Sequence, residues 1–287
     1  MSDPRAPRAG EWLGGLVGFA RRRLAGESGA DPESGFDPEF NRVLLMPVAR
    51  ALYRNWFRVR MRGIGNVPSS GPALVVANHS GVIPVDAIML QVGILDEHPA
   101  ARNLRLLGAD LVYSVPVLAD LARKSGHVRA SPAEAERLLR SGELVGVFPE
   151  GFKGIGKPFS ERYRLRRFGR GGFARTAMRT RSPMIPCAIV GAEEIYPMVA
   201  DWPRVAARLR LPYFPVTPLF PWLGPLGVIP LPSKWIIEFC DPVPTDGFTP
   251  DQWEDEEVIA ELAGKVKATI DRKLGELLAE RGPAFGG

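Results

Sequence analysis

Apolar residues along this chain follow two patterns that predict strands and helices in turn. Short uninterrupted apolar runs predict buried strands, and longer stretches with apolar residues at helical spacing predict amphipathic helices. The predicted strands are 73–77, 104–108, 127–129, 144–148, 184–190 and 235–240, and the predicted helices are 87–95, 117–124, 132–140, 171–181 and 258–280. This alternation predicts an α/β fold with a single mixed, largely parallel sheet flanked by helices.

The N-terminal part of the chain carries a different pattern, in which apolar positions mix with arginines. Residues 1–37 are predicted to be a flexible region that includes an amphipathic helix over 11–24. Residues 38–62 are predicted to be one basic amphipathic helix in contact with a membrane, because its six arginines suit an anionic bilayer surface. The alternative is an ordinary amphipathic helix that packs on the protein's own core. Residues 63–287 are predicted to form the main domain.

The overall charge narrows the choice of partners. The 287 residues carry a net charge of +5 and the pI is near 9.4, which favours phosphate-bearing substrates, membrane surfaces or nucleic acid. Cys187 and Cys240 both lie in apolar runs and are predicted to be buried thiols. The three histidines are too scattered for a histidine-rich metal site, so we expect no metal and no cofactor.

One uncharged stretch, residues 211–232, is long enough to span a bilayer but holds seven prolines, which exclude a regular helix. Its aromatic residues Tyr213, Phe214, Phe220 and Trp222 suit the headgroup region of a lipid surface. The alternative is a loop that wraps over the protein's own core. No other stretch is typical of a membrane-spanning helix.

The first candidate for chemistry lies where the predicted strand 73–77 ends. Asn78 and His79 follow the strand directly, Gly81 predicts a turn, and Asp86 stands just before the next predicted helix. Parallel sheets place ligands at the carboxyl ends of their strands, so His79 is a candidate general base and Asp86 its orienting partner. The alternative for Asp86 is a purely structural role as the cap of the helix that follows.

The second candidate follows strand 144–148 at the same predicted edge of the sheet. There Phe148 and Pro149 end the strand, Glu150 follows, and Gly151 permits a close turn of the backbone. The alternative is a solvated glutamate in a strand-to-loop turn.

A dense run of cations follows Glu150. Only Glu161 offsets them locally, and such a density of one sign favours an anion site for phosphate, a pantetheine nucleotide or a lipid headgroup. Nucleic acid is not supported, because no nucleic-acid-binding motif is present. The cations are Lys153, Lys157, Arg162, Arg164, Arg166, Arg167, Arg170, Arg175, Arg179 and Arg181.

Several enzyme classes are disfavoured by missing motifs. The sequence holds no GxSxG segment of a serine hydrolase, no phosphate-binding P-loop motif, and no GxGxxG after a predicted strand.

These residues resemble the glycerolipid acyltransferase family of lysophosphatidate- and glycerol-3-phosphate-type enzymes. Residues 78–86 look like the family's histidine–aspartate motif, and residues 148–151, Phe-Pro-Glu-Gly, are similar to its third block. Arg129 corresponds to the second-block arginine that contacts the acceptor, and residues 185–191 look like the fourth block, whose proline shapes the acyl site. The blocks occur in the family's order. In one respect the chain departs from the pattern: six residues separate His79 from Asp86, where the family usually has four.

The resemblance implies an acyltransferase domain over 63–287 that moves a fatty acyl chain from acyl-CoA or acyl carrier protein to a hydroxyl of a glycerolipid or lysophospholipid. It implies that His79 and Asp86 are catalytic, and that Asn78, Arg129, Phe148, Pro149, Glu150, Gly151, Lys153 and Lys157 bind substrate. We expect a peripheral protein on the cytoplasmic face of an anionic membrane. Two alternatives stay open: an esterase or thioesterase that uses water, and a non-catalytic protein that binds lipid or an acyl carrier.

Overall fold

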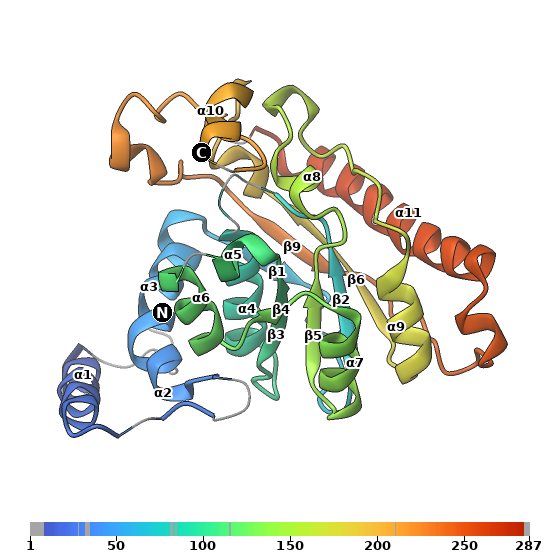
Figure 1. Cartoon of the computed structure of the whole chain (residues 1–287), viewed down its shortest axis with the longest axis horizontal. Coiled ribbons are helices and arrows are strands. Elements are labelled where there is room, and N and C mark those ends of the chain that lie inside the picture. The colour runs from blue at the N-terminus through green and yellow to red at the C-terminus, as the bar shows by residue number, and fades with distance from the viewer. Residues whose placement is uncertain are drawn as a thin grey trace.

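The centre of the fold is a seven-stranded sheet covered by helices on both faces (Figure 1). A computed structural model describes residues 9–27, 29–31, 35–80, 83, 85–114, 116–209 and 211–283. The strands of the sheet, in the spatial order β1-β9-β6-β2-β5-β3-β4, are Arg60–Arg62, Ile236–Phe239, Met184–Val190, Ala73–Ala77, Leu144–Val147, Leu104–Gly108 and Val128–Arg129.

Five of these strands run parallel to one another, and the remaining pair runs the opposite way. β6, β2, β5, β3 and β4 are parallel, β9 pairs antiparallel with β6, and β1 pairs parallel with β9. The predicted fold class is therefore confirmed. A separate two-stranded ladder joins β7, Ala200–Asp201, to β8, Pro215–Val216.

Helices cover both faces of the sheet, and the sheet separates the apolar core into two halves. The α-helices are α1 Ala9–Leu24, α2 Pro38–Phe40, α3 Met46–Ala51, α4 Val85–Glu97, α5 Asp110–Ser114, α6 Pro116–Lys124, α7 Pro132–Arg140, α8 Phe152–Ile155, α9 Gly172–Thr180, α10 Pro203–Leu209 and α11 Glu256–Arg281. Two π-helical segments, η1 Asn41–Leu45 and η2 Leu52–Trp56, flank α3. The 3₁₀ segments are η3 Ile64–Asn66, η4 Phe159–Glu161, η5 Ala192–Glu194, η6 Gly224–Val228 and η7 Asp251–Trp253.

The central strand β2 has a continuous apolar sequence because it is buried on both faces of the sheet. All five of its residues are buried, because alternate side chains enter opposite halves of the core. Val75 packs in the half that contains α4, and Leu74 and Val76 pack in the half that contains α7, α9 and α11. Since both faces are covered, no polar position interrupts the strand.

The predicted single helix over 38–62 is wrong at its C-terminal end. The helical segment ends at Trp56, and Arg60–Arg62 form the edge strand β1 against β9. Arg58 has a φ of 47°, which ends the helical path, and from there apolar and basic residues alternate with the two-residue period of a strand. The sheet therefore begins before the predicted domain boundary at residue 63.

The helical part of this segment packs on the core. Met46, Ala49 and Tyr53 are buried in the same half of the core as α4. Arg50 and Arg54 lie 2.7 and 3.0 Å from carboxylate oxygens of Asp96 at the end of α4. These two arginines therefore compensate a charge of the protein itself, and membrane contact by this helix stays a prediction.

Among the described residues, no helix has both the length and the apolar character needed to cross a bilayer.

Candidate active site

His79 and Asp86 meet at the carboxyl end of β2. His79 follows the last residues of the strand, and Asp86 is the second residue of α4. Nδ1 of His79 and Oδ2 of Asp86 are 2.8 Å apart. A carboxylate only accepts hydrogen bonds, so Nδ1 carries the proton and the opposite ring nitrogen, Nε2, is left as the basic atom. The six-residue separation therefore permits the pairing, and the predicted turn residues Gly81 and Pro84 lie outside the described residues.

Asp86 is held rigidly by the backbone around it. Its side chain is fully buried, Oδ2 also accepts from the backbone N–H of Ser80 at 2.9 Å, and Oδ1 accepts from the N–H of Ala87 at 2.9 Å. Its place in the first turn of α4 adds the favourable field of a helix N-terminus. Asp86 therefore orders the backbone at the start of α4 from within the helix, not as the predicted cap before Ala87, and it holds the imidazole at the same time.

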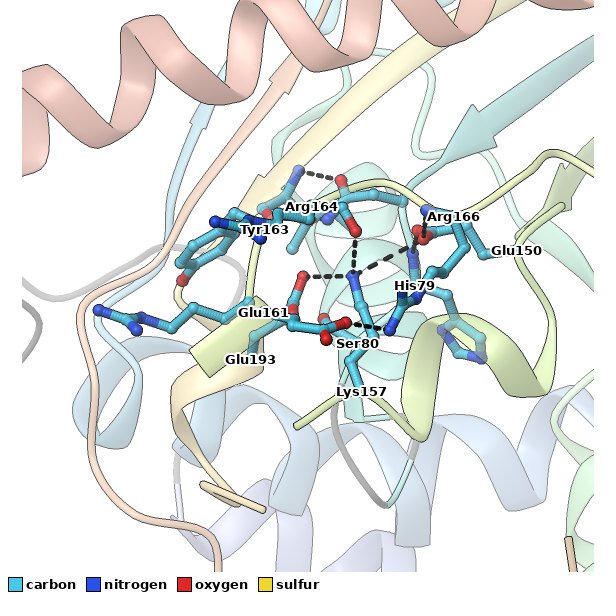
Figure 2. A network of polar contacts seen from close by, with 12 residues as sticks. His79, Ser80, Glu150, Lys157, Glu161, Tyr163, Arg164, Arg166 and Glu193 are labelled. Carbon is cyan, nitrogen blue, oxygen red and sulfur yellow. Dashed lines mark hydrogen bonds and ion pairs between the residues drawn. The ribbon is translucent and has the colours of Figure 1, made fainter. Parts of the chain in front are cut away.

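Glu150 holds the backbone of His79 in place from the neighbouring strand. Its buried side chain accepts from the backbone N–H of His79 at 3.1 Å and from the backbone N–H of Arg166 at 2.6 Å. The ammonium of Lys157 lies 3.6 Å from the second of these oxygens (Figure 2). Glu150 is thus no solvated turn residue, since both its oxygens are used within the protein.

Lys157 is the centre of a closed cluster of charges. Only 2% of its side chain is exposed, and its ammonium donates to Glu193 at 2.9 Å and to the carbonyl of Arg164 at 3.3 Å. Figure 2 shows this ammonium between the carboxylates of Glu150 and Glu193. A contact between Lys157 and a substrate is disfavoured by this burial, and the position of the residue supports a role in positioning Glu150.

Glu193 is absent from the residues predicted from sequence. It lies in η5, directly after the buried strand β6, at the same edge of the sheet as His79. Burial raises the pKa of Glu193 to about 7, while the charge and hydrogen bond of Lys157 act in the opposite direction. The sequence does carry a signal for Glu193, because a polar residue just after a buried parallel strand is a candidate site residue. The same pattern identifies His79.

Asn78 connects two strands through its side chain. It is fully buried, its Nδ2 donates to the carbonyl of Ile189 at 3.0 Å, and its Oδ1 accepts from the N–H of the same residue at 2.7 Å. Both halves of the amide are therefore occupied by β6. The arrangement favours a structural role over the predicted contact with substrate.

The Phe-Pro-Glu-Gly turn packs against the histidine. The ring of Phe148 stacks on the imidazole with centroids 4.4 Å apart and an interplanar angle of 26°. Gly151 has a φ of 55°, which favours glycine, and the turn at Pro149 is closed by a 3.1 Å hydrogen bond from the Gly151 N–H to the Phe148 carbonyl. Phe148 therefore fixes the plane of the ring that Asp86 holds at its edge.

Gly154, like Glu193, contributes to the site but is not among the residues predicted from the sequence. A Cβ at this position would lie 2.8 Å from the Cβ of Glu150 and 3.2 Å from both the Cβ and the carbonyl oxygen of His79. The close approach of α8 to the histidine therefore requires glycine at residue 154.

Apart from the buried Lys157, the predicted cations fall into two groups, and Arg166 belongs to the first, ion-paired group through its contact with Glu161. Arg175 and Arg179 form ion pairs with acidic residues near the start of α11 and with Glu136, so they support packing of α9. The others, which are exposed and have no ion pair with any described residue, are Lys153, Arg162, Arg164, Arg167, Arg170 and Arg181. The second group is the part of the run that is free to meet an anion.

Arg129 is the predicted site residue that the fold places farthest from the histidine. It lies on β4, three strands away from β2, or about 14 Å at the usual strand spacing. Its side chain is 62% exposed, its Nε lies 3.3 Å from Asp110, and its guanidinium stands 5.8 Å from the ring of Tyr113. The predicted contact of Arg129 with substrate therefore stays a prediction.

The arrangement is suited to proton transfer by an imidazole. One ring edge is fixed by a buried carboxylate, the ring face is covered by Phe148, and the backbone is held by Glu150. Within the described residues, no group of three or more His, Cys, Asp or Glu side chains is placed to hold a metal ion.

Comparison with known proteins identifies the same core region. The family model described as Acyltransferase matches residues 58–190, from just before β1 to the end of β6. An uncharacterized protein of Mycobacterium tuberculosis is 52% identical over 272 residues, which cover 95% of this chain and 76% of that protein. A human protein described as a DGAT1/2-independent enzyme synthesizing storage lipids is 24% identical over 76% of this chain and 62% of its own length.

A solved structure shares the fold. The crystal structure of the 1-acyl-sn-glycerophosphate (LPA) acyltransferase PlsC from Thermotoga maritima matches with a TM-score of 0.58 and 20% sequence identity. The match covers 91% of this chain and 88% of that one.

Proposed function

This chain belongs to the acyltransferase family, and we propose that it moves a fatty acyl chain from a thioester to a hydroxyl of a glycerolipid or lysophospholipid. The observation that carries the proposal is the 2.8 Å contact between His79 and Asp86, which leaves Nε2 of His79 basic. The thioester is acyl-CoA or acyl carrier protein, and no cofactor takes part.

The proposed reaction is a direct transfer between donor and acceptor. Nε2 of His79 takes the proton of the acceptor hydroxyl while the hydroxyl oxygen attacks the thioester carbonyl. The new C–O bond forms, the C–S bond breaks, and the imidazolium returns its proton to the leaving sulfur. Asp86 stabilises the imidazolium, and general-base assistance of this kind contributes on the order of 10²–10⁴ in rate.

The oxyanion of the tetrahedral intermediate needs donors that the protein does not already use. The backbone N–H groups of His79 and Ser80 donate to Glu150 and Asp86, so neither is free for this purpose. The turn after His79 is a predicted source of such donors, and its residues Gly81 and Val82 lie outside the described residues.

The donor and the membrane are both expected to meet positive charge. We propose that Lys153, Arg164, Arg167 and Arg170 contact the phosphates of acyl-CoA or the acidic surface of a carrier protein. Their exposure and lack of ion pairs among the described residues support this role. We further propose that the protein is peripheral on the cytoplasmic face of an anionic membrane, where its acceptor resides.

A transfer assay tests the proposal. The protein is incubated with radiolabelled acyl-CoA and a panel of lysophospholipid and glycerolipid acceptors, and the lipid products are separated. The wild type should form labelled acylated lipid, and His79→Ala should lose this activity by at least about 10²-fold. Labelled free fatty acid that appears without an acceptor would favour the esterase alternative, and full turnover by His79→Ala would refute the mechanism.

A further inference from the structure

Most of the exposed large apolar side chains of the described residues lie in a segment outside the region matched by the family model. The larger part of the segment between β6 and β9, residues 199–209 and 211–232, is here called the excursion. Nine of the fifteen large apolar side chains that are exposed among the described residues belong to it. These are Val199, Trp202, Leu209, Leu211, Trp222, Leu223, Leu226, Val228 and Ile229.

We propose that the excursion is the surface by which this protein docks on an anionic lipid bilayer. The proposal deepens the proposed function, because it identifies which part of the chain contacts the membrane that supplies the acceptor. Soluble proteins seldom expose apolar side chains at this density unless the surface has a partner.

Aromatic contacts gather part of this surface into one cluster. The ring of Trp202 stacks on Phe214 with centroids 6.0 Å apart, and it meets Trp222 edge-on at 6.0 Å. Phe214 in turn lies 5.4 Å from Phe220. Trp222 is nevertheless 64% exposed, and Leu226 in η6 is 62% exposed. The cluster is thus packed on one side and still presents large apolar groups to its surroundings.

The charge of the excursion favours lipid over a protein partner. Residues 199–232 hold three arginines, no Glu or Lys, and a single acidic residue, Asp201, whose Oδ1 accepts from the backbone N–H of Phe214 at 2.8 Å. Arg204 and Arg208 on α10 are exposed and form no ion pair with any described residue. Apolar and aromatic side chains beside an excess of arginines suit insertion at the headgroup level of an anionic leaflet.

The excursion begins close to the candidate active site. Glu193, which accepts from Lys157, lies only six residues before Val199. The backbone carbonyl of Met198 accepts from the N–H of Phe159 at 2.8 Å, which joins the start of the excursion to the loop that carries Lys157. Figure 1 shows α10 and α8 at the same end of the sheet. A bilayer at this surface would therefore present lipid headgroups near His79.

The helical segment 38–56 offers less to a membrane. Its exposed large apolar side chains are Val48 and Trp56, and the indole of Trp56 already donates to the carbonyl of Pro230 in the excursion at 2.9 Å. The end of this segment therefore adjoins the excursion, which carries far more of the exposed apolar surface.

Vesicle binding tests the proposal without reference to turnover. Sucrose-loaded vesicles of phosphatidylcholine with phosphatidylglycerol are sedimented with the wild type, with Trp222→Ser/Leu226→Ser, and with the control Leu121→Ser on α6. The double variant should bind about tenfold more weakly or worse, because two large side chains no longer enter the interface. The control should bind as the wild type does, and so should His79→Ala, even if the proposed chemistry fails.

Variants of the two exposed arginines on α10 provide a second test of the proposal. Arg204→Gln/Arg208→Gln should lose about fivefold in affinity per charge on anionic vesicles, and should match the wild type on neutral vesicles. Unchanged binding of Trp222→Ser/Leu226→Ser would overturn the proposal. A wild type that sediments as a dimer and becomes monomeric in this variant would also overturn it, because a second copy would then be the partner.

Discussion

Two buried charge clusters contact His79, and they differ in whether they leave a side-chain atom available to react with a substrate. The first is the pair of His79 and Asp86, in which the carboxylate is saturated by donors while one ring nitrogen stays available. The second joins Lys157 to Glu150 and Glu193, and its ammonium and both carboxylates have their partners within the protein. A buried ion pair is weak support for stability by itself, but loss of one partner leaves an expensive unpaired charge. We infer that the first cluster serves the reaction and the second holds its geometry.

The strongest test of this difference is the substitution Asp86→Asn. Transfer activity should fall on the order of 10³–10⁴-fold, because an amide no longer stabilises the imidazolium or holds the required tautomer. The free energy of unfolding should fall by about 1–3 kcal/mol, since an amide NH₂ would face backbone donors. Steady-state kinetics and urea unfolding measure the two losses, with the exposed Asp271→Asn as the control. Losses of equal size would support a purely structural role for Asp86.

The substitution Lys157→Met should lower the free energy of unfolding more than it lowers transfer activity. Two buried carboxylates lose their cation, so the free energy of unfolding should fall by about 3–5 kcal/mol. The double variant Lys157→Met/Glu193→Leu should recover part of this loss, because one of the unpaired charges is gone. Urea unfolding of both, beside the exposed Lys265→Met, measures the effect. If the protein that remains folded loses activity as severely as Asp86→Asn does, the division between the clusters is wrong.

A smaller effect should follow pH at Glu193. Its pKa is raised from 4.5 to about 7 in the folded protein, so the folded state binds this proton more tightly than the unfolded state does. The resulting stabilisation is present below pH 4.5 and is lost as pH rises towards 7. Relative to Glu193→Gln, the wild type should therefore lose about 1–3 kcal/mol over this range.

Unfolding of the wild type, of Glu193→Gln and of the exposed control Glu261→Gln at several pH values measures this difference. A wild type that gains stability over Glu193→Gln as pH rises would mean that the ion pair with Lys157 outweighs burial.

The part of the site that could be predicted is the part encoded locally. The resemblance to the glycerolipid acyltransferases is confirmed, and the strand that precedes His79 has the predicted bounds Ala73–Ala77. A strand that ends in a histidine and a helix that starts with a carboxylate are close in sequence, so a short turn joins them. The helix starts at Val85, two residues before its predicted start, which places Asp86 in its first turn.

The part that could not be predicted depends on segments far apart in the chain. Lys157 resembled the other cations of its run, and only the packing of its loop against η5 shows that its charge is enclosed. Likewise, Asn78 binds a backbone 111 residues away, which no local pattern records. At residues 58–62, the two-residue alternation follows a helical pattern directly, so a prediction from apolar spacing continues the helix into the strand.

The pairing of β1 with β9 limits how the protein can be shortened. A chain that starts at residue 63 would make β9, with the sequence Ile-Ile-Glu-Phe, the edge of the sheet in place of β1, which is only three residues long and carries two arginines. Such an uncovered edge is a template for β-pairing with a neighbouring molecule, and so invites aggregation. The N-terminal segment therefore ends in a short, charged edge strand, which disfavours pairing of the sheet with a second molecule.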